Sequence, residues 1–192
     1  KERPLQAIDF FAGAGGLSIG VTNAYDVPTS DRIIEARKGN LVDHKNEKSK
    51  LLVSACVVET NPVALQSACA FLPSTVGVQH TFLELDWSEI KETGNEKYDE
   101  LLNCCHVSLD GSPCQDISAA NATRFEGDSR RNSLLWRQPY DVVRSKVKWA
   151  IKENSVGILH RRPNNKEPLV NEIMRYYILH GYQCQIFILK AY

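Results

Sequence analysis

A cysteine in a rigid turn is the side chain of this sequence best placed for covalent chemistry. Cys114 lies in the segment Gly-Ser-Pro-Cys-Gln at residues 111–115, directly after the strand-like run 106–109. Gly111 lets the backbone bend and Pro113 fixes one φ angle, so the thiol is held at the tip of a predicted strand. Free cysteines are usually buried and inert, and a structural cysteine in a tight turn is the alternative. The rigid turn favours a nucleophile.

A glycine-rich turn near the start of the chain is a second candidate site. The predicted buried strand 5–11 runs into Gly13, Gly15 and Gly16, and residues 17–20 open a helix. A strand, a glycine turn and a helix in this order let a backbone approach a nucleotide-like ligand closely. Glycine turns also serve plain chain reversal, so this turn alone is a weak signal.

Carboxylates end three further predicted strands. Glu59, Asp86 and Glu153 each come at the end of an apolar segment. In a parallel sheet these positions meet at the edge where ligands bind. Glu59 suits a ribose, and Asp86 suits an adenine amino group with Trp87 packed on the ring. Taken singly, each carboxylate is also consistent with an ordinary exposed residue at a strand end, and Trp87 with a residue of the hydrophobic core. Together they predict a site for an adenosine-containing cofactor.

Strands and helices alternate along the sequence. Strands are predicted at 5–11, 52–58, 81–85, 106–109, 149–151 and 184–189, and helices from 17, at 61–71, at 134–147 and at 167–180. This alternation predicts an α/β fold, a doubly wound and mostly parallel sheet with helices on both faces. Pro139 is expected to interrupt the third of these helices. Residues 26–50 are polar, and the charged cluster at 44–50 is interpreted as a solvated loop rather than a binding patch.

Composition sets wider limits. A length of 192 residues suits one domain. The 23 basic and 23 acidic residues balance, so the net charge gives no indication of nucleic-acid binding. No apolar run is long enough to span a membrane, and the first residues lack the apolar core of a signal peptide. The six cysteines lack paired CxxC spacing, so no metal site is expected. Reduced cysteines suit a cytoplasmic protein.

Several motifs, in order along the chain, resemble those of the cytosine-5 DNA methyltransferases. Residues 9–16, Asp-Phe-Phe-Ala-Gly-Ala-Gly-Gly, resemble the first motif of that family, and 111–115 resemble its Gly-x-Pro-Cys-Gln motif, with Ser118 three residues beyond the Gln. Residues 128–134 resemble the fifth motif, and 153–154 stand where Glu-Asn-Val belongs. The resemblance covers most of the chain and implies a Rossmann-like methyltransferase fold.

The resemblance also implies an activity, which is methyl transfer from S-adenosylmethionine to carbon 5 of cytosine in duplex DNA, leaving S-adenosylhomocysteine. Cys114 would add to carbon 6 of a flipped-out base, and Glu153 would hold a proton on ring nitrogen 3. Cofactor contacts are implied for Phe11, Ala12, Gly13, Gly15, Gly16, Leu17, Glu59, Thr60, Asp86, Trp87, Gly111, Pro113 and Leu134.

The chain departs from the family pattern in places. Ser155 stands where Val is usual, and Lys152 puts a charge just before Glu153 in a strand expected to be apolar. The family's Gln-x-Arg motif, target-recognition domain and last motif do not follow. We therefore expect 1–192 to be a single, partial S-adenosylmethionine-binding catalytic domain, incomplete at its C-terminus. A missing region or a second chain would supply target recognition, and the chain alone would not turn over appreciably.

Three interpretations stay open. The leading one is the catalytic half of a DNA methyltransferase from a restriction–modification or phage context, located in the cytoplasm, or in the nucleus if eukaryotic. The second keeps the chemistry and replaces DNA with a transfer RNA cytosine. The third is an inactive regulatory subunit that binds the cofactor or a partner. A nicotinamide-dependent oxidoreductase is disfavoured, because the glycine turn does not match G-x-G-x-x-G as usually placed.

Overall fold

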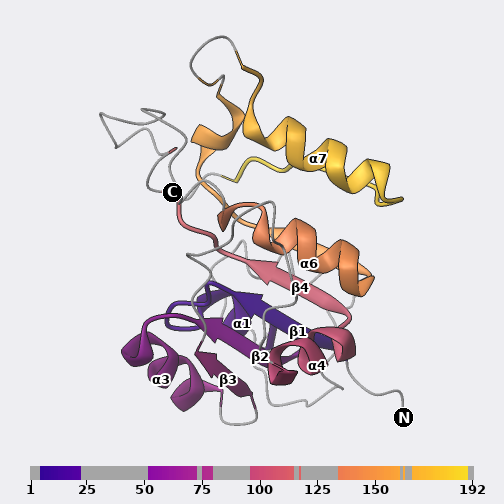
Figure 1. Ribbon diagram of the computed structural model, residues 1–192. Helices are drawn as coiled ribbons and strands as arrows, with labels where there is room; N and C mark the ends of the chain where they lie inside the picture. The colour runs from indigo at the N-terminus through magenta and orange to yellow at the C-terminus, as the bar shows by residue number, and fades with distance from the viewer. Residues whose placement is uncertain are drawn as a thin grey trace, which may run out of the picture.

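A parallel β-sheet forms the centre of the computed structural model, which describes residues 5–22, 52–72, 75–79, 96–114, 117, 134–160, 162 and 166–189 (Figure 1). The strands are β1 (Leu5–Phe10), β2 (Leu52–Glu59), β3 (Val76–Gln79), β4 (Val107–Asp110) and β5 (Trp149–Lys152). The helices are α1 (Gly16–Thr22), α3 (Pro62–Phe71), α4 (Glu96–Cys104), α6 (Arg137–Ser145), α7 (Leu169–Leu179) and the short 3-10 helix η2 (Val156–Leu159).

The order of the strands confirms the predicted doubly wound fold. The described sheet runs β3-β2-β1-β4-β5, and every neighbouring pair is parallel. From β1, the next strands along the chain, β2 and β3, are added on one side of the sheet. The later strands, β4 and β5, are added on the other side of β1. The carboxyl ends of β1 and β4 meet at this reversal, which is the place where doubly wound sheets bind their ligands.

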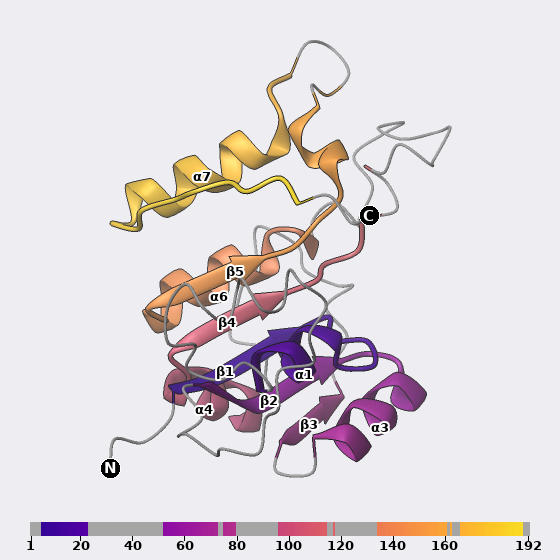
Figure 2. The same ribbon diagram turned by 180° about the vertical axis from the view of Figure 1, so that it is seen from behind.

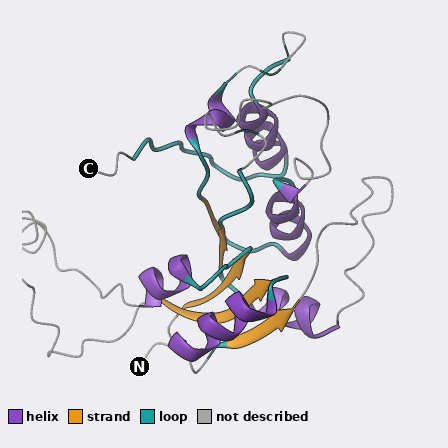
Figure 3. Cartoon of the chain, turned by 90° about the vertical axis from the view of Figure 1, so that its left-hand side faces the viewer, coloured by secondary structure: helices purple, strands orange, loops and turns teal. Residues whose placement is uncertain are grey.

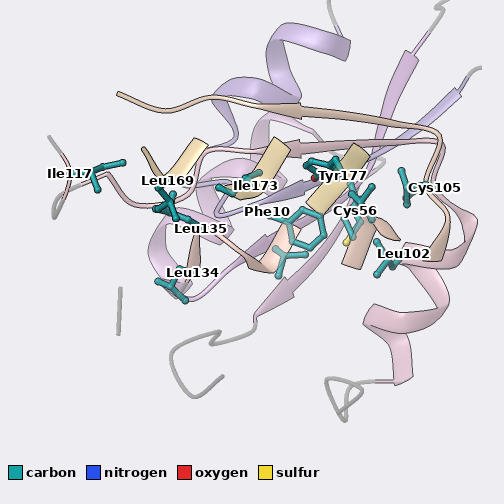
Figure 4. Packing of buried hydrophobic residues seen from close by; sticks show 14 residues of the cluster. Phe10, Cys56, Leu102, Cys105, Ile117, Leu134, Leu135, Leu169, Ile173 and Tyr177 are labelled. Carbon is teal, nitrogen blue, oxygen red and sulfur yellow. The ribbon is translucent and has the colours of Figure 1, made fainter. Parts of the chain in front are cut away.

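Both faces of the sheet are covered by helices (Figure 3). Ile8, Phe10, Cys56 and Val58 point to one face, where they form the main core with residues of α4, α6 and α7. Figure 4 shows Phe10 and Cys56 together with Leu102 of α4 and Ile173 and Tyr177 of α7. The alternate residues of the strands pack on the other face against α1 and α3. Strands buried on both faces read as apolar runs, which is why their positions were predictable.

The start of α3 is set by local sequence. Asn61 is the N-cap residue, and its side chain accepts hydrogen bonds from the backbone N–H groups of Val63 at 2.9 Å and Ala64 at 3.3 Å. Pro62 occupies the first helical position, where no intrahelical donor is lost. This cap fixes the direction in which the chain leaves the carboxyl end of β2.

One expectation about the elements was wrong, and two elements were not predicted. The helix expected to be interrupted by Pro139 begins only at Arg137, so the proline lies in the first turn, where its missing N–H has no intrahelical partner. The helix α4 was not predicted from the sequence. The strand β3, which pairs with β2 at one side of the described sheet, was not predicted either. The predicted strand 81–85 lies outside the described residues.

The predicted sixth strand at 184–189 is also wrong. This segment, drawn in yellow beside α7 in Figure 2, forms no regular element. Its apolar side chains are exposed, with Phe187 71% and Leu189 89% accessible. An apolar run becomes a strand only where its backbone groups find a ladder partner, and within the described sheet β5 remains an edge strand. Across the described part of the chain, no helix combines the length and apolarity needed to cross a membrane.

Candidate active site

The turn after β1 adopts backbone conformations that side chains rarely allow. Gly13 and Gly15 have φ angles of +53° and +87°, and Phe11, a non-glycine residue, has a φ of +55°. A Cβ atom on Gly15 would lie 3.1 Å from the Cβ of Ala68, so the turn packs tightly onto α3 there. Gly13 meets nothing within 4 Å and leaves open space. The turn is thus packed against α3 at Gly15, whereas the space beside Gly13 is open.

Glu59 fastens this turn to the end of β2. Its Oε2 accepts a hydrogen bond from the Gly13 N–H at 2.8 Å, and its Oε1 accepts from the N–H groups of Thr60 and Asn61, each at 2.8 Å. A carboxylate offers about four lone-pair sites, so one remains for a further donor such as a ribose hydroxyl. The side chain is half-buried, at the mouth of the glycine turn.

Asp9 places a second carboxylate beneath the turn, and sequence reasoning did not single it out. It is buried, and its Oδ2 accepts from the N–H and the hydroxyl of Ser18, at 3.1 and 2.8 Å. Its Oδ1 has no hydrogen-bond partner in the described part of the chain. Burial raises the pKa of Asp9 to about 6; the Ser18 hydrogen bonds oppose this, and the charges of Asp110 and Glu59 add to it.

The turn that carries Cys114 follows β4 and lies beside the glycine turn. The Gly111 N–H donates to the Phe10 carbonyl at 3.3 Å, which joins the two turns directly. The Ile117 N–H donates to the Cys114 carbonyl at 3.1 Å and closes the turn. Cys114 itself is half-buried against the main core. The structure thus brings the two predicted turns together at the strand-order reversal.

Charged side chains bind this turn to β5. Lys152 Nζ lies 2.5 Å from Asp110 Oδ2 and donates to Ser112 Oγ at 2.8 Å. Asn154 Nδ2 donates to the Ser112 carbonyl at 3.1 Å. Lys152 departed from the expected apolar strand, and the structure gives the reason: Asp110, its register partner on β4, is a buried carboxylate that needs a cation.

Glu153 follows β5 at the same edge of the sheet. Its backbone N–H donates to the Asp110 carbonyl at 2.8 Å, and its side chain is exposed. Cys114 and Glu153 therefore leave adjacent parallel strands at the same end. A thiol and a carboxyl group arranged in this way can serve as nucleophile and proton donor to one planar ligand.

A glycine in η2 was missed by sequence reasoning. A Cβ atom on Gly157 would lie 1.7 Å from the carbonyl oxygen of Ile117, so these two backbones are in direct contact. Ile117 is buried and belongs to the turn that Cys114 begins. Nothing in the sequence marks this contact, because it joins residues forty positions apart. Gly157 thus supports the Cys114 turn from the side of η2.

The remaining predicted residues fall into three groups. Ala12, Gly16 and Leu17 lie in the β1–α1 turn or the first turn of α1, and Gly111 and Pro113 lie in the Cys114 turn. Leu134 is buried in the main core just before α6. Asp86, Trp87 and Ser118 lie outside the described residues. Among the described side chains, no group of three or more His, Cys, Asp or Glu could hold a metal ion.

Comparisons with known proteins agree with this geometry. A family model described as C-5 cytosine-specific DNA methylase matches residues 76–192. One similar solved structure is a protein assigned as a DNA modification methyltransferase encoded within an E. coli prophage, with 22% identity and a TM-score of 0.55 over 90% of this chain and 37% of that one. Another is the Entamoeba histolytica methyltransferase EhMeth, with 13% identity and a TM-score of 0.58 over 95% and 46%.

These likenesses have a limited extent. The chain spans less than half the length of either solved structure, and at these identities the likeness shows the fold alone. A comparison with curated proteins gives no match. The family model, by contrast, covers more than half of the chain, including both Cys114 and Glu153.

Proposed function

Because the chain belongs to the C-5 cytosine-specific DNA methylase family, we propose that it transfers a methyl group from S-adenosylmethionine to carbon 5 of a DNA cytosine. The observation that carries this proposal is the hydrogen bond from the Gly111 N–H to the Phe10 carbonyl, which sets the turn bearing Cys114 against the glycine turn. A nucleophile and a nucleotide-binding turn at one point of a doubly wound sheet suit group transfer from an adenosine cofactor.

The residues present fit S-adenosylmethionine. The cofactor carries a sulfonium and an ammonium, and the unpartnered Oδ1 of buried Asp9 and the carboxylate of Glu59 make the site favourable for cations. Open space at Gly13 leaves room for a ligand against the backbone. Glu59 would hold the ribose, and the backbone from Ala12 to Leu17 would wrap the methionine part. Phe11 would stack on the adenine, with Thr60, Asp86 and Trp87 lining it.

The proposed chemistry of the chain's own groups starts at Cys114. Its thiolate adds to carbon 6 of the cytosine, the electron pair of the 5–6 double bond moves to carbon 5, and Glu153 keeps a proton on ring nitrogen 3. When bound, S-adenosylmethionine would supply the methyl group that carbon 5 takes up, with its bond between sulfur and methyl broken and S-adenosylhomocysteine left. A base then removes the carbon 5 proton, the bond between sulfur and carbon 6 breaks, and Cys114 is freed.

The substrate must leave the helix before Cys114 can reach it. Carbon 6 of a stacked cytosine is inaccessible inside a duplex, so the base is flipped out into the site. We propose that residues 1–192 form one partial catalytic domain. A further region or a second chain then reads the DNA sequence and closes the pocket. In this proposal, the methyl transfer takes place at the carboxyl ends of β1, β4 and β5, and the DNA sequence is recognised by the further region or second chain.

A trapping experiment tests the proposal. In duplex DNA with 5-fluorocytosine throughout, carbon 5 carries fluorine in place of the proton, so elimination is blocked and the adduct persists. With S-adenosylmethionine present, we expect the full-length protein to form a complex that survives denaturing electrophoresis. Cys114→Ser should abolish it, and Cys104→Ser, at an exposed cysteine, should not. An adduct in Cys114→Ser, or none in the parent protein, contradicts the proposal.

A further inference from the structure

Two opposite charges lie where β4 and β5 end, in strands otherwise suited to apolar residues. Asp110 is 0% exposed and the Lys152 side chain is 14% exposed. They are register partners on adjacent parallel strands, and their charged atoms are 2.5 Å apart. Replacing a buried ion pair by apolar residues is often neutral or stabilising, so stability alone is a weak reason for this pair. The contacts around it indicate a different role.

The pair and Asn154 together hold Ser112 at every polar atom. The Ser112 N–H donates to Asp110 Oδ1 at 2.5 Å, its hydroxyl accepts from Lys152 Nζ at 2.8 Å, and its carbonyl accepts from Asn154 Nδ2 at 3.1 Å. Ser112 is buried and stands two residues before Cys114. The residue between them is Pro113, whose ring limits rotation of the backbone. Because the backbone between Ser112 and Cys114 has little freedom to rotate, fixing Ser112 also fixes the position of Cys114.

The same lysine lies next to the other reactive group. Lys152 directly precedes Glu153, whose N–H donates to the Asp110 carbonyl. Asp110 therefore contacts the turn through its side chain and the Glu153 backbone through its carbonyl. One cluster of hydrogen bonds joins the strand that carries Glu153 to the turn that carries Cys114.

We propose that Lys152 is a positioning residue, which sets the Cys114 thiol relative to Glu153 by holding Asp110 and Ser112; this inference rests on the proposed function. Its ammonium does not touch the base. It acts by fixing the turn before substrate arrives, and reactions between positioned groups are sensitive to displacements of about 1 Å.

The test measures the rate of adduct formation on 5-fluorocytosine DNA by the full-length protein. Lys152→Met should lower this rate at least about tenfold. Its dissociation constant for S-adenosylmethionine should stay within about twofold, because the contacts of Glu59 and the glycine turn are intact. Lys152→Arg, which keeps a cation, should recover part of the rate. Arg175→Met, which breaks the exposed pair with Glu167, is the matched control and should change neither quantity.

A double variant separates positioning from stability. Asp110→Leu with Lys152→Met removes both buried charges, so its unfolding midpoint should recover relative to Lys152→Met. Its adduct rate should stay low, because the side chain and N–H of Ser112 have lost their partners. Recovery of the rate together with the midpoint overturns the proposal.

A second variant covers the case in which the double variant does not fold. Ser112→Ala removes only the hydroxyl that Lys152 holds, and it should lower the adduct rate severalfold with cofactor binding unchanged. An unchanged rate overturns the inference. Absence of any adduct in the parent protein is a different result, because it removes the proposed function itself.

Discussion

The Oε2 atom of Glu59 accepts a hydrogen bond from the Gly13 N–H at 2.8 Å, which ties the end of β2 to the turn after β1. The same carboxylate accepts two N–H groups at the start of the segment leading into α3. One side chain therefore orders both segments from which the cofactor contacts are proposed to come. Removal of the Glu59 carboxylate should therefore weaken cofactor binding more than it changes the reactivity of Cys114.

We expect Glu59→Ala to weaken the binding of S-adenosylmethionine by roughly tenfold to a hundredfold. Loss of hydrogen bonds to a charged group costs about 1.5–3 kcal/mol, which corresponds to that range. Glu59→Gln keeps one acceptor oxygen and should lose less. Calorimetric titration of the chain measures both dissociation constants. Glu167→Ala, at an exposed ion pair with Arg175, is the control. Equal affinities in Glu59→Ala and the parent chain would exclude a binding role for Glu59.

Gly15→Ala should reduce the free energy of unfolding by about 1–3 kcal/mol. The left-handed backbone at this position strains any side chain, and the added methyl group would meet Ala68 at 3.1 Å. Gly20→Ala is the matched control, because Gly20 lies within α1 and an added Cβ meets nothing within 4 Å. That change should be neutral or stabilise by up to about 1 kcal/mol. Denaturant unfolding of the two variants should therefore give effects of opposite sign or very different size.

Gly157→Ala should disturb the turn that carries Cys114. Its methyl group would overlap the Ile117 carbonyl, so one of the two backbones must move. We expect adduct formation on 5-fluorocytosine DNA to fall by at least about tenfold, as for other displacements of reacting groups. Binding of S-adenosylmethionine, measured by calorimetry on the same sample, should be retained. A parent-like adduct rate would show that the turn does not depend on this contact.

Asp9 gives the stability of the fold a dependence on pH. Burial raises its pKa to about 6 in the folded state, so the folded protein binds a proton more tightly than the unfolded chain does. The contribution of Asp9 is therefore most favourable below about pH 4, declines as the pH rises through about 6, and is constant above that.

The variant Asp9→Asn removes this titration and keeps an oxygen acceptor for Ser18. The difference in unfolding free energy between variant and parent should shift in favour of the variant from pH 4 to pH 6.5, by roughly 1–3 kcal/mol. Denaturant unfolding at several pH values measures it. A difference that does not change with pH would mean that Asp9 titrates alike in the folded and unfolded chain.

Much of the fold was predictable because β4, most of β1 and half of β2 are buried, and these strands read as apolar runs. The alternation of the predicted strands with helices indicated a parallel sheet, which the described strands form. The helix α4 was missed because Glu96–Cys104 is mostly polar and its only buried-face signal is the pair of leucines at its end. The apolar run 184–189 misled for the opposite reason, since apolar character does not supply a hydrogen-bonding partner.

The candidate site was predictable where one short motif contains the signal. Cys114 and the glycine turn each lie in a local pattern that the chain shows by itself. The roles of Lys152 and Gly157 depend on contacts across strands and turns, with Asp110 and Ile117 respectively. Such contacts leave no local sequence pattern. From the sequence alone, Lys152 is an unexplained charge in an apolar strand, and only the structure shows its buried partner Asp110 on β4.

The most direct measurement of the central claim is the position of the transferred methyl group. The full-length protein is incubated with labelled S-adenosylmethionine and either duplex DNA or transfer RNA, and the nucleosides are then separated. We predict label in 5-methylcytosine from DNA, none from transfer RNA, and none from either with Cys114→Ala. Label on the exocyclic nitrogen of cytosine, label confined to transfer RNA, or undiminished transfer by Cys114→Ala would contradict the account.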